Sequence, residues 1–393
     1  MLYRKYRPQT FGQVVGQEHV VKTLRGALTT GRTGHAYLFC GPRGTGKTTI
    51  ARLLAKSLNC ANFSKIFDGN FNEKLSIRRS LAVPSETLSE GWGEGGFDVP
   101  CNQCDQCLAV NQNRSLDLIE IDAASNRGID EIRSLKESAL VSAPSGGYKV
   151  FIIDEVHMLT KDAFNALLKI LEEPPSHVVF ILATTEPHKI LPTVLSRVQR
   201  FDFRRITPVQ IVGKLEQMAK SEKIDIDKEG LMAIAVSADG GLRDAEVSLS
   251  KVMASHDNRK EISVDDVYSS LGLIPLNYYP ELLGYIVSND KNSALDLINR
   301  AYAGGVDLEH LASGFVDYLR KVLMHTINPA ILTSVGEELL DNDIKLISTY
   351  SQALTSQQII LMLNVFVSAK EGMKSSPIPQ LPLELAILEL ISS

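Results

Sequence analysis

The most informative part of the chain reads Gly41-Pro42-Arg43-Gly44-Thr45-Gly46-Lys47-Thr48-Thr49. It follows an apolar run, 36–40, typical of a buried strand, and precedes a segment, 50–56, whose apolar residues have helical spacing. Between a strand and a helix, the pattern G-x-x-x-x-G-K-[ST] indicates a phosphate-binding loop, whose backbone N–H groups and helix N-terminus surround phosphates. The loop therefore predicts a nucleoside triphosphate site, with Lys47 at the β- and γ-phosphates and Thr48 on Mg²⁺.

Two further apolar runs end in polar residues that belong with this loop. Residues 148–153 are followed by Asp154 and Glu155, and residues 178–183 are followed by Thr184 and Thr185. Open α/β sheets bind ligands beyond the carboxyl ends of their strands, so we expect these side chains to share one crevice. Asp154 would orient the Mg²⁺ shell and Glu155 would polarise the attacking water. The ordinary alternative for the two carboxylates is a pair of exposed strand-end caps.

The distribution of patterns along the chain predicts its architecture. Five apolar runs alternate with helical segments up to residue 205, near 36–40, 116–122, 148–154, 178–183 and 200–203. This alternation predicts an α/β fold with a parallel, doubly wound five-stranded sheet. From about residue 206 the β pattern ends and helical segments follow, at 208–222, 228–238, 242–255 and 263–271, and then to the end of the chain. We predict domains at 1–205, 206–273 and 274–393.

Four of the cysteines have the spacing of a metal site. Cys101, Cys104 and Cys107 form a C-x₂-C-x₂-C run, and Cys60 lies upstream. This favours a tetrahedral Cys₄ zinc site, in a module at about 60–107. An iron–sulfur cluster is the alternative, but its run needs a fourth cysteine at position 111, which is asparagine. The intervening stretch, 61–100, is predicted to be an inserted loop, and Cys40 is expected to be a small core residue.

Composition narrows the class of protein. With 393 residues, 44% hydrophobic and 22% charged, the chain is typical of globular proteins and too long for one core. Its net charge of −5 argues against a general nucleic-acid coat, although local basic surface could still hold DNA. We expect no secretory signal or membrane span and a cytoplasmic location, where clustered cysteines suggest metal. Pro8, Val14 and Val15 precede the loop and could contact an adenine ring, or simply pack against the domain.

Taken together, these motifs resemble one family, the AAA+ clamp loader ATPases of bacterial DNA polymerase III, the gamma/tau subunits. The resemblance is carried by the basic segment Leu2–Pro8, the phosphate loop, the four cysteines and the runs 153–159, 168–175, 183–187, 195–197 and 241–245. It is weaker over 275–393, where mainly the closing Leu-Pro-Leu-Glu-Leu matches. Zinc cysteines inside an AAA+ module are unusual, which makes the combination specific.

The resemblance implies roles for individual residues. Thr185 or Thr184 would be the sensor that contacts the γ-phosphate or water. Arg197 would be an arginine finger acting on ATP held by a neighbouring subunit, and Arg243 would be the lid sensor for the chain's own nucleotide. Arg127 resembles a position that touches the DNA backbone. Phosphoryl transfer requires charge around the γ-phosphate, so these roles are physically sensible; the ordinary alternatives are a surface arginine at 197 and a helix-start arginine at 243.

The resemblance also implies a function. The chain would be an ATPase that uses ATP binding and hydrolysis, with Mg²⁺ and zinc as cofactors, to open a sliding clamp and load it on primed DNA. It would belong to the DNA-directed DNA polymerase holoenzyme without itself polymerising. Its partners would be other loader subunits, in a hetero-oligomeric ring joined through a collar at 274–393, with 206–273 as the lid. The clamp and the backbone of primed DNA would be further partners.

Three alternatives and three departures qualify this resemblance. The alternatives are another AAA+ DNA-remodelling ATPase, a non-hydrolysing scaffold subunit and a zinc-dependent DNA reader. Intact Lys47, Thr48, Asp154 and Glu155 argue against the scaffold subunit.

The first departure from the family pattern is Val198, which stands where the family usually has cysteine. The spacing between Cys60 and Cys101 is longer than usual, which zinc tolerates because the cost of loop closure grows only logarithmically with length. The chain also ends after the collar, as in the short, gamma-type form.

Overall fold

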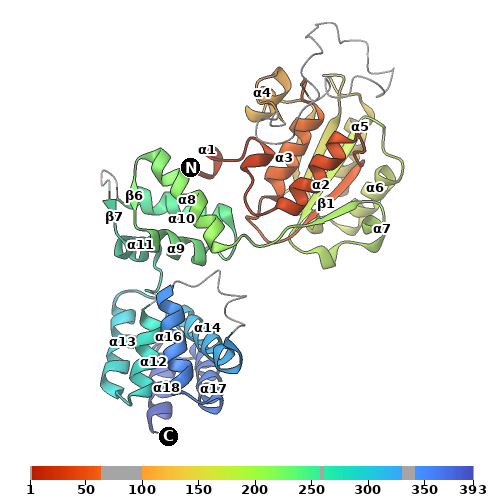
Figure 1. The fold of residues 1–393 in the computed structure, drawn as a ribbon. Coiled ribbons are helices and arrows are strands. Elements are labelled where there is room, and N and C mark those ends of the chain that lie inside the picture. Colours follow the sequence, from red (N-terminus) through yellow and green to blue (C-terminus); the bar gives the residue numbers. More distant parts are fainter. Residues whose placement is uncertain (1, 63–99, 257–260, 276, 330–340, 393) are drawn as a thin grey trace. The chain divides into compact units, whose positions relative to one another are not determined.

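The computed structural model describes residues 2–62, 100–256, 261–275, 277–329 and 341–392 (Figure 1). Most of the predicted inserted loop, at 63–99, therefore lies outside the described residues. The chain divides into two compact units, Met1–Ile206 with Asp239–Asp244, and Thr207–Ala238 with Ala245–Ser393. The predicted boundary between lid and collar, at 273/274, stays a prediction.

The first unit is built on a parallel sheet of five strands. They are β1 (Ala36–Cys40), β2 (Leu118–Asp122), β3 (Lys149–Asp154), β4 (Val178–Thr184) and β5 (Gln199–Asp202), in the order β2-β3-β4-β1-β5. The central strands β1, β3 and β4 are buried almost throughout, while the edge strands β2 and β5 are partly exposed. Buried parallel strands read as continuous apolar runs, which is why the sequence located them. The predicted α/β class with a five-stranded parallel sheet is confirmed.

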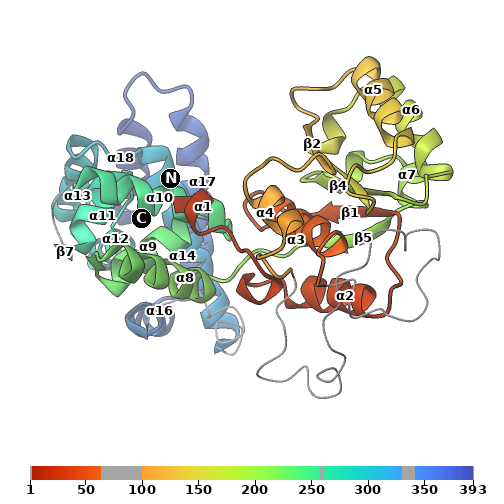
Figure 2. The same ribbon diagram turned by 90° about the horizontal axis from the view of Figure 1, so that it is seen from above.

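Helices cover both faces of this sheet (Figure 2). On one face, α2 (Glu18–Thr29) and α3 (Lys47–Leu58) pack against alternate strand residues such as Phe39 and Ile152. On the other face, α5 (Ile129–Leu140), α6 (Lys161–Glu172) and α7 (Pro192–Leu195) pack against the intervening ones, such as Leu38 and Ile153. Successive residues of a strand point to opposite faces, so each strand contributes to two separate cores.

Shorter elements complete the first unit. They are α1 (Leu2–Lys5), η1 (Phe11–Gln13), α4 (Asp105–Asn111), η3 (Val156–Met158) and η4 (Pro187–Lys189). The register of the sheet aligns Cys40 with Thr184 and pairs Ile153 with Leu182. The carboxyl ends of β1, β3 and β4 therefore meet at one edge, where the predicted site residues follow the strands.

The second unit begins with helices α8 (Pro208–Glu222), α9 (Lys228–Ser237), α10 (Leu242–Ser255) and α11 (Val264–Leu271). The first residues of α10, up to Asp244, belong to the first unit. Ser263 is the N-cap of α11, and its side chain accepts a hydrogen bond from the backbone N–H of Asp266. The expectation that β structure ends near 206 is wrong in one detail, because β6 (Asp225–Ile226) and β7 (Glu261–Ile262) pair in parallel. Two-residue strands are too short to show a period of two in a sequence.

The rest of the second unit is helical. Its elements are α12 (Tyr278–Val287), α13 (Lys291–Ala303), α14 (Leu308–Ile327), α16 (Asp341–Ala353), α17 (Ser356–Met373) and α18 (Leu381–Ser392). They share one core, in which the rings of Phe315 and Phe366 lie 4.5 Å apart. In α18 one side of the leucine-rich segment is buried, including Ile387, whereas Leu385 is 55% exposed. Within the described residues, no helix is both long and apolar enough to span a membrane.

Candidate active site and metal centre

The loop after β1 can adopt its shape only with glycine at certain positions. Gly41 has φ +145°, Gly44 +77° and Gly46 +97°, all in the left-handed region. A Cβ at Gly41 would lie 2.5 Å from the carbonyl oxygen of Phe203, closer than real side chains approach. Glycine reaches these angles without steric cost, so the loop turns tightly from β1 into α3.

Lys47 is the first residue of α3 and is 6% exposed. Its Nζ donates to the carbonyl oxygens of Gly41, at 2.8 Å, and Pro42, at 2.7 Å. Burial lowers the pKa of Lys47, and the nearby carboxylates of Glu155 and Asp154 oppose that shift. The ammonium therefore lies inside the loop, near the carboxylates of Asp154 and Glu155 at the end of β3.

Thr48 and Asp154 come together between α3 and β3. The Thr48 hydroxyl donates to Asp154 Oδ2 at 2.8 Å, although the residues are 106 positions apart. A hydroxyl next to a carboxylate at a phosphate loop is the oxygen donor set that Mg²⁺ prefers. These two residues fit the predicted Mg²⁺ site.

Glu155 lies beside the end of β4. It has φ +48°, an uncommon conformation for a non-glycine residue. Its Oε2 accepts from the Thr185 hydroxyl at 3.0 Å and from the Thr185 backbone N–H at 3.4 Å. Thr184 is fully buried, and its hydroxyl instead contacts His157 Nδ1 at 3.0 Å. Of the two threonines that the sequence left open, Thr185 is the one that contacts Glu155.

His157 lies against this cluster, either as a residue that lines the site or as an ordinary buried histidine with satisfied partners. Its side chain is 6% exposed, with Nδ1 3.4 Å from Glu155 Oε2 and Nε2 3.4 Å from Glu186 Oε1. The imidazole has partners on both sides and also borders Glu155. Nothing in the linear sequence separates these two descriptions, because Glu186 and Thr184 approach His157 only in the folded sheet.

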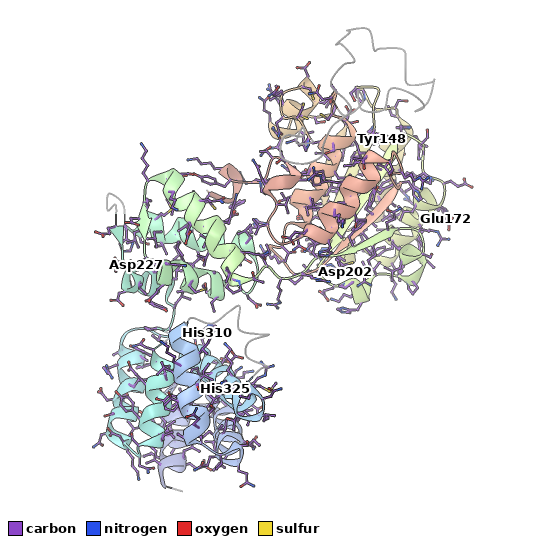
Figure 3. All side chains as sticks on the ribbon, in the orientation of Figure 1. Tyr148, Glu172, Asp202, Asp227, His310 and His325 are labelled. Atoms are coloured by element: carbon purple, nitrogen blue, oxygen red, sulfur yellow. The ribbon has the colours of Figure 1, made fainter. Side chains whose placement is uncertain are left out.

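Arg197 lies at the opposite end of the sheet. It precedes β5, whose first residue pairs with Tyr37 near the start of β1, whereas the phosphate loop follows the end of β1. A five-residue strand spans roughly 13 Å. Figure 3 labels Glu172, the ion-pair partner of Arg197, and Asp202, the last residue of β5, which lie apart from each other. The structure therefore does not bring Arg197 to Lys47.

The Arg197 side chain is held in place locally. Its guanidinium contacts Glu172 Oε1 at 2.8 Å, the Thr193 carbonyl at 2.7 Å and the Ser196 hydroxyl at 2.9 Å. A cleft of about 650 Å³ adjoins it, lined by Gly34, His35, Ala36, Leu171, Glu172, Ser196, Arg197, Val198 and Gln199. The arginine thus faces an open hollow at the surface of the first unit.

Arg243 reaches the loop from a different part of the chain. Its backbone N–H donates to the Gly44 carbonyl at 3.5 Å, and its guanidinium lies 5.0 Å from the centre of the Tyr3 ring. The side chain borders a second pocket, of about 440 Å³, lined by Tyr3, Arg4, Arg7, Pro8, Gln9, Thr49, Arg52, Leu53, Lys56, Val110, Asn111, Asn113 and Arg243. Several arginine and lysine side chains line this pocket. The pKa of Arg7 is lowered mainly by burial and secondly by the positive charge of Arg52.

The three predicted adenine contacts separate in the structure. Pro8 lines this second pocket. Val14 and Val15 are half-buried, and Val14 packs against the core beneath α2 and α3. Arg127, the predicted DNA contact, is exposed after β2, and its Nε donates to the Ala124 carbonyl at 2.8 Å.

The four predicted metal ligands converge. The sulfur atoms of Cys60, Cys101, Cys104 and Cys107 all lie within 4.8 Å of one another, and those of Cys101 and Cys107 are 3.9 Å apart. Four sulfurs around one zinc ion at about 2.3 Å would be about 3.8 Å apart, so this donor set fits zinc. The backbone N–H groups of residues 103 and 104 point at the Cys101 sulfur, at 3.5 and 3.4 Å. The pKa of Cys107 is raised, first by its hydrogen bond with Cys60 and then by burial.

Two buried polar residues were missed by the sequence analysis. Gln17 is fully buried, and its amide bridges the loop and the segment after β5: Nε2 donates to the Arg204 carbonyl at 2.7 Å and the Thr45 carbonyl at 3.4 Å. Lys56, in the last turn of α3, is 3% exposed. The only signal in the sequence is that Lys56 shares a helical stripe with Thr49 and Leu53, which is weak evidence for a buried lysine.

Comparisons with known proteins agree with this picture. The family model described as DNA polymerase III, delta subunit, matches residues 16–80 and 87–207, and the model of DNA polymerase III subunits gamma and tau domain III matches 262–393. The chain is 36% identical over 389 residues to DNA polymerase III subunit tau of Bacillus subtilis, covering 99% of this chain and 62% of that protein. It is 35% identical to the tau subunit of Escherichia coli, over 100% of this chain and 55% of that protein.

A shorter relative aligns from end to end. The DNA polymerase III subunit gamma of Buchnera aphidicola is 33% identical over 393 residues, which is 100% of this chain and 99% of that protein. Among solved structures, the clamp loader delta protein of Bacillus subtilis has a TM-score of 0.40 at 15% identity, covering 95% of this chain and 99% of that one, which is too low to carry an argument. The alignment to the gamma subunit and the domain III match show that this chain belongs to the family of DNA polymerase III gamma and tau subunits.

Proposed function

We propose that this chain is an ATP-driven clamp loader subunit, which uses ATP binding and hydrolysis to open a sliding clamp and place it on primed DNA. Membership of the gamma and tau family supports the role in replication. The observation that carries the ATPase activity is the cluster at one sheet edge, where Thr48 contacts Asp154 and Thr185 contacts Glu155 beside the buried Lys47.

The residues of this cluster divide the chemistry between them. Lys47 and the loop N–H groups would hold the β- and γ-phosphates of ATP, and Thr48 and Asp154 would hold Mg²⁺, which neutralises charge on the phosphates. Glu155 would accept a proton from the water that attacks the γ-phosphorus, while the bond to the ADP oxygen breaks. Thr185 keeps the Glu155 carboxylate in position for that step.

The two arginines would act on different nucleotides. Arg243 adjoins Gly44 of its own loop, which supports a role as sensor of the chain's own ATP. Arg197 lies at the far end of the sheet from Lys47, which supports a role on the ATP of a neighbouring subunit. An arginine supplied by a neighbour makes turnover depend on assembly, because an isolated chain lacks the charge that stabilises the transition state.

The remaining parts would organise the assembly. Cys60, Cys101, Cys104 and Cys107 would hold a structural zinc ion. Residues 206–273 would form the lid, and residues 274–393 the collar that joins other loader subunits in a ring. Exposed apolar side chains on α17 and α18, such as Leu361 and Leu385, support a collar that contacts partners. Arg127 would contact the DNA backbone, and the role places the protein in the cytoplasm with the chromosome.

The test is ATP turnover per chain against protein concentration, with and without loader partners, clamp and primed DNA. Wild type is compared with Arg197→Ala and with Arg133→Ala, a control that removes another exposed arginine paired with a carboxylate. Turnover should rise on assembly and fall by roughly 10³-fold in Arg197→Ala alone. Turnover indifferent to concentration and to Arg197 would overturn the trans mechanism, and nucleotide binding without hydrolysis would indicate a scaffold subunit.

A further inference from the structure

We propose that Lys56 couples the metal centre to the nucleotide pocket, so that each ligand raises the affinity of the other. The inference rests on the proposed zinc and ATP sites, and it assigns a positioning role to a residue that touches neither ligand. Three observations carry it: the contacts of the Lys56 ammonium, the position of the segment Arg7–Gln9, and the charge of a loaded Cys₄ centre.

The Lys56 ammonium joins two parts of the chain that are remote in sequence. Its Nζ donates to Asn102 Oδ1 at 2.5 Å and to Asn111 Oδ1 at 2.6 Å, both in the cysteine module. It also approaches Gln9, with Oε1 at 3.0 Å and the backbone carbonyl at 3.3 Å. An ammonium has three N–H groups, so these four oxygens use its full donor capacity. Displacing either partner would leave buried polar atoms unpaired.

On the module side, these contacts depend directly on the cysteines. Asn102 directly follows Cys101 in the chain. Its Nδ2 donates to the Gln9 carbonyl at 3.0 Å, a second link to the same segment. Asn111 ends α4, the helix that carries Cys107. A metal ion that fixes the cysteine sulfurs therefore also fixes the two asparagine oxygens that Lys56 needs.

On the nucleotide side, the segment held by Lys56 forms a wall of the pocket beside the phosphate loop. Pro8 and Gln9 line this pocket together with Thr49 of α3 and with Arg243. Tyr3, which precedes this segment in the chain, lies under the Arg243 guanidinium. Asn111 lines the pocket from the module. A shift of Gln9 would therefore move both the predicted base contact, Pro8, and the support of Arg243.

Charge gives the coupling its direction. The four acceptors of Lys56 are neutral amide and carbonyl oxygens, and a buried ammonium requires a negative counter-charge. Four thiolates on one zinc ion carry a formal charge of about −2. The loaded centre supplies that counter-charge next to Lys56, which keeps the lysine, and with it Gln9, in the observed position. Metal and nucleotide thus stabilise the same arrangement, and linkage requires the effect to be reciprocal.

The experiment measures this reciprocity on the full chain. The equilibrium Kd of zinc is measured by competition with a chromophoric chelator, with and without a non-hydrolysable ATP analogue and Mg²⁺, and the Kd of the analogue is measured for zinc-loaded and zinc-stripped protein. In wild type we expect the analogue to tighten zinc binding and zinc to tighten analogue binding, each by the same factor of roughly 5- to 20-fold. In Lys56→Met both ligands should still bind, but the two effects should fall to about 1-fold.

Two further variants separate coupling from general damage. Lys149→Met removes another buried lysine, whose Nζ donates to the Ser138 carbonyl at 2.6 Å in α5, and it should leave the coupling intact. Asn102→Ala removes the link from the module side, and it should abolish the coupling even if Lys56→Met does not fold. A merely structural role for Lys56 would lower stability in both lysine variants without removing reciprocity from one alone.

Two results would overturn the coupling through Lys56. If wild type binds both ligands but neither affects the other, or if Lys56→Met and Asn102→Ala keep the full effect, the proposal is overturned while the proposed function stands. Failure of the proposed function would look different. Zinc would then be absent from wild type, or Lys47→Ala would bind nucleotide as tightly as wild type.

Discussion

Thr185 directly follows β4, and Glu155 directly follows the neighbouring strand β3. The Thr185 hydroxyl donates a hydrogen bond to Glu155 Oε2 at 3.0 Å. The backbone N–H of Thr185 points to the same oxygen, at 3.4 Å. Glu155 has a left-handed backbone, and its Oε2 also lies 3.4 Å from His157 Nδ1. The pair links adjacent strands at the edge where the phosphate loop begins.

Removing either member of this pair should slow hydrolysis more than it weakens ATP binding. Glu155→Gln should lower turnover by about 10²- to 10³-fold, because the amide cannot accept the proton from water. Thr185→Val should lower it by roughly 10-fold, because the carboxylate loses a hydrogen bond that orients it. Single-turnover hydrolysis by the assembled loader and nucleotide binding by fluorescence distinguish the two effects. Full turnover in Glu155→Gln would show that another group activates the water.

Alanine at three glycines should give three different changes in stability. Gly41→Ala should cost about 3 kcal/mol or more, because it combines a left-handed φ with a Cβ 2.5 Å from the Phe203 carbonyl. Gly46→Ala should cost about 1–2 kcal/mol, because its φ is +97° but its Cβ would meet open space. Gly26→Ala, inside α2, should stabilise by about 0.5–1 kcal/mol. Urea unfolding followed by circular dichroism measures all three, and equal effects at 41 and 46 would contradict the clash.

The Cys40 thiol should make stability fall at high pH. Burial raises the pKa of Cys40 to about 11, from an ordinary value of 9.0. Between these values the unfolded thiol releases its proton while the folded one keeps it, so the free energy of unfolding decreases as pH rises from about 9 to about 11. The loss amounts to about 2–3 kcal/mol.

Comparison with Cys40→Ala isolates this effect from other titrating groups. The difference in unfolding free energy between wild type and Cys40→Ala should shrink by about 2 kcal/mol between pH 7.5 and pH 10.5. Urea unfolding at both pH values measures the difference. A constant difference would show that the thiol titrates alike in the folded and unfolded chain.

Removing one metal ligand should remove the zinc. Cys107→Ser should contain no zinc by elemental analysis and should melt several degrees lower than wild type, since the binding energy of a structural zinc contributes directly to folding. Cys40→Ser is the matched control, because Cys40 lies in β1 and is the one cysteine of the chain outside the cluster. Zinc retained in Cys107→Ser, or lost equally in Cys40→Ser, would contradict the assignment.

Much of the fold could be predicted from the sequence because its signals are local. The strand 36–40 was located to the residue, and the helix 208–222 likewise, since apolar spacing and capping depend on near neighbours. The spacing of Cys101, Cys104 and Cys107 likewise indicated a cluster. The strands at the sheet edges shifted by one or two residues, because partial exposure weakens the apolar pattern.

The arrangement of the sites was decided by contacts between distant residues. Gln17 meets Arg204 across 187 positions, and Lys56 meets Gln9 and Asn102 across 47 and 46. No spacing rule connects such residues, since their proximity follows from strand order, register and the way α3 packs on the sheet. For the same reason, only the tertiary structure placed Arg197 at the end of the sheet opposite Lys47.

The sequence by itself therefore determined the phosphate loop, the strands that end in Asp154 and Thr184, and the cysteine cluster, because short-range periodicity and glycine geometry specify them. The tertiary structure alone decided that Thr185 rather than Thr184 meets Glu155, that Leu385 of α18 faces outward while Ile387 is buried, and that a buried lysine lies between two sites. The physical reason is that burial and hydrogen-bond pairing belong to the packed chain, where residues far apart in sequence compete for the same partners.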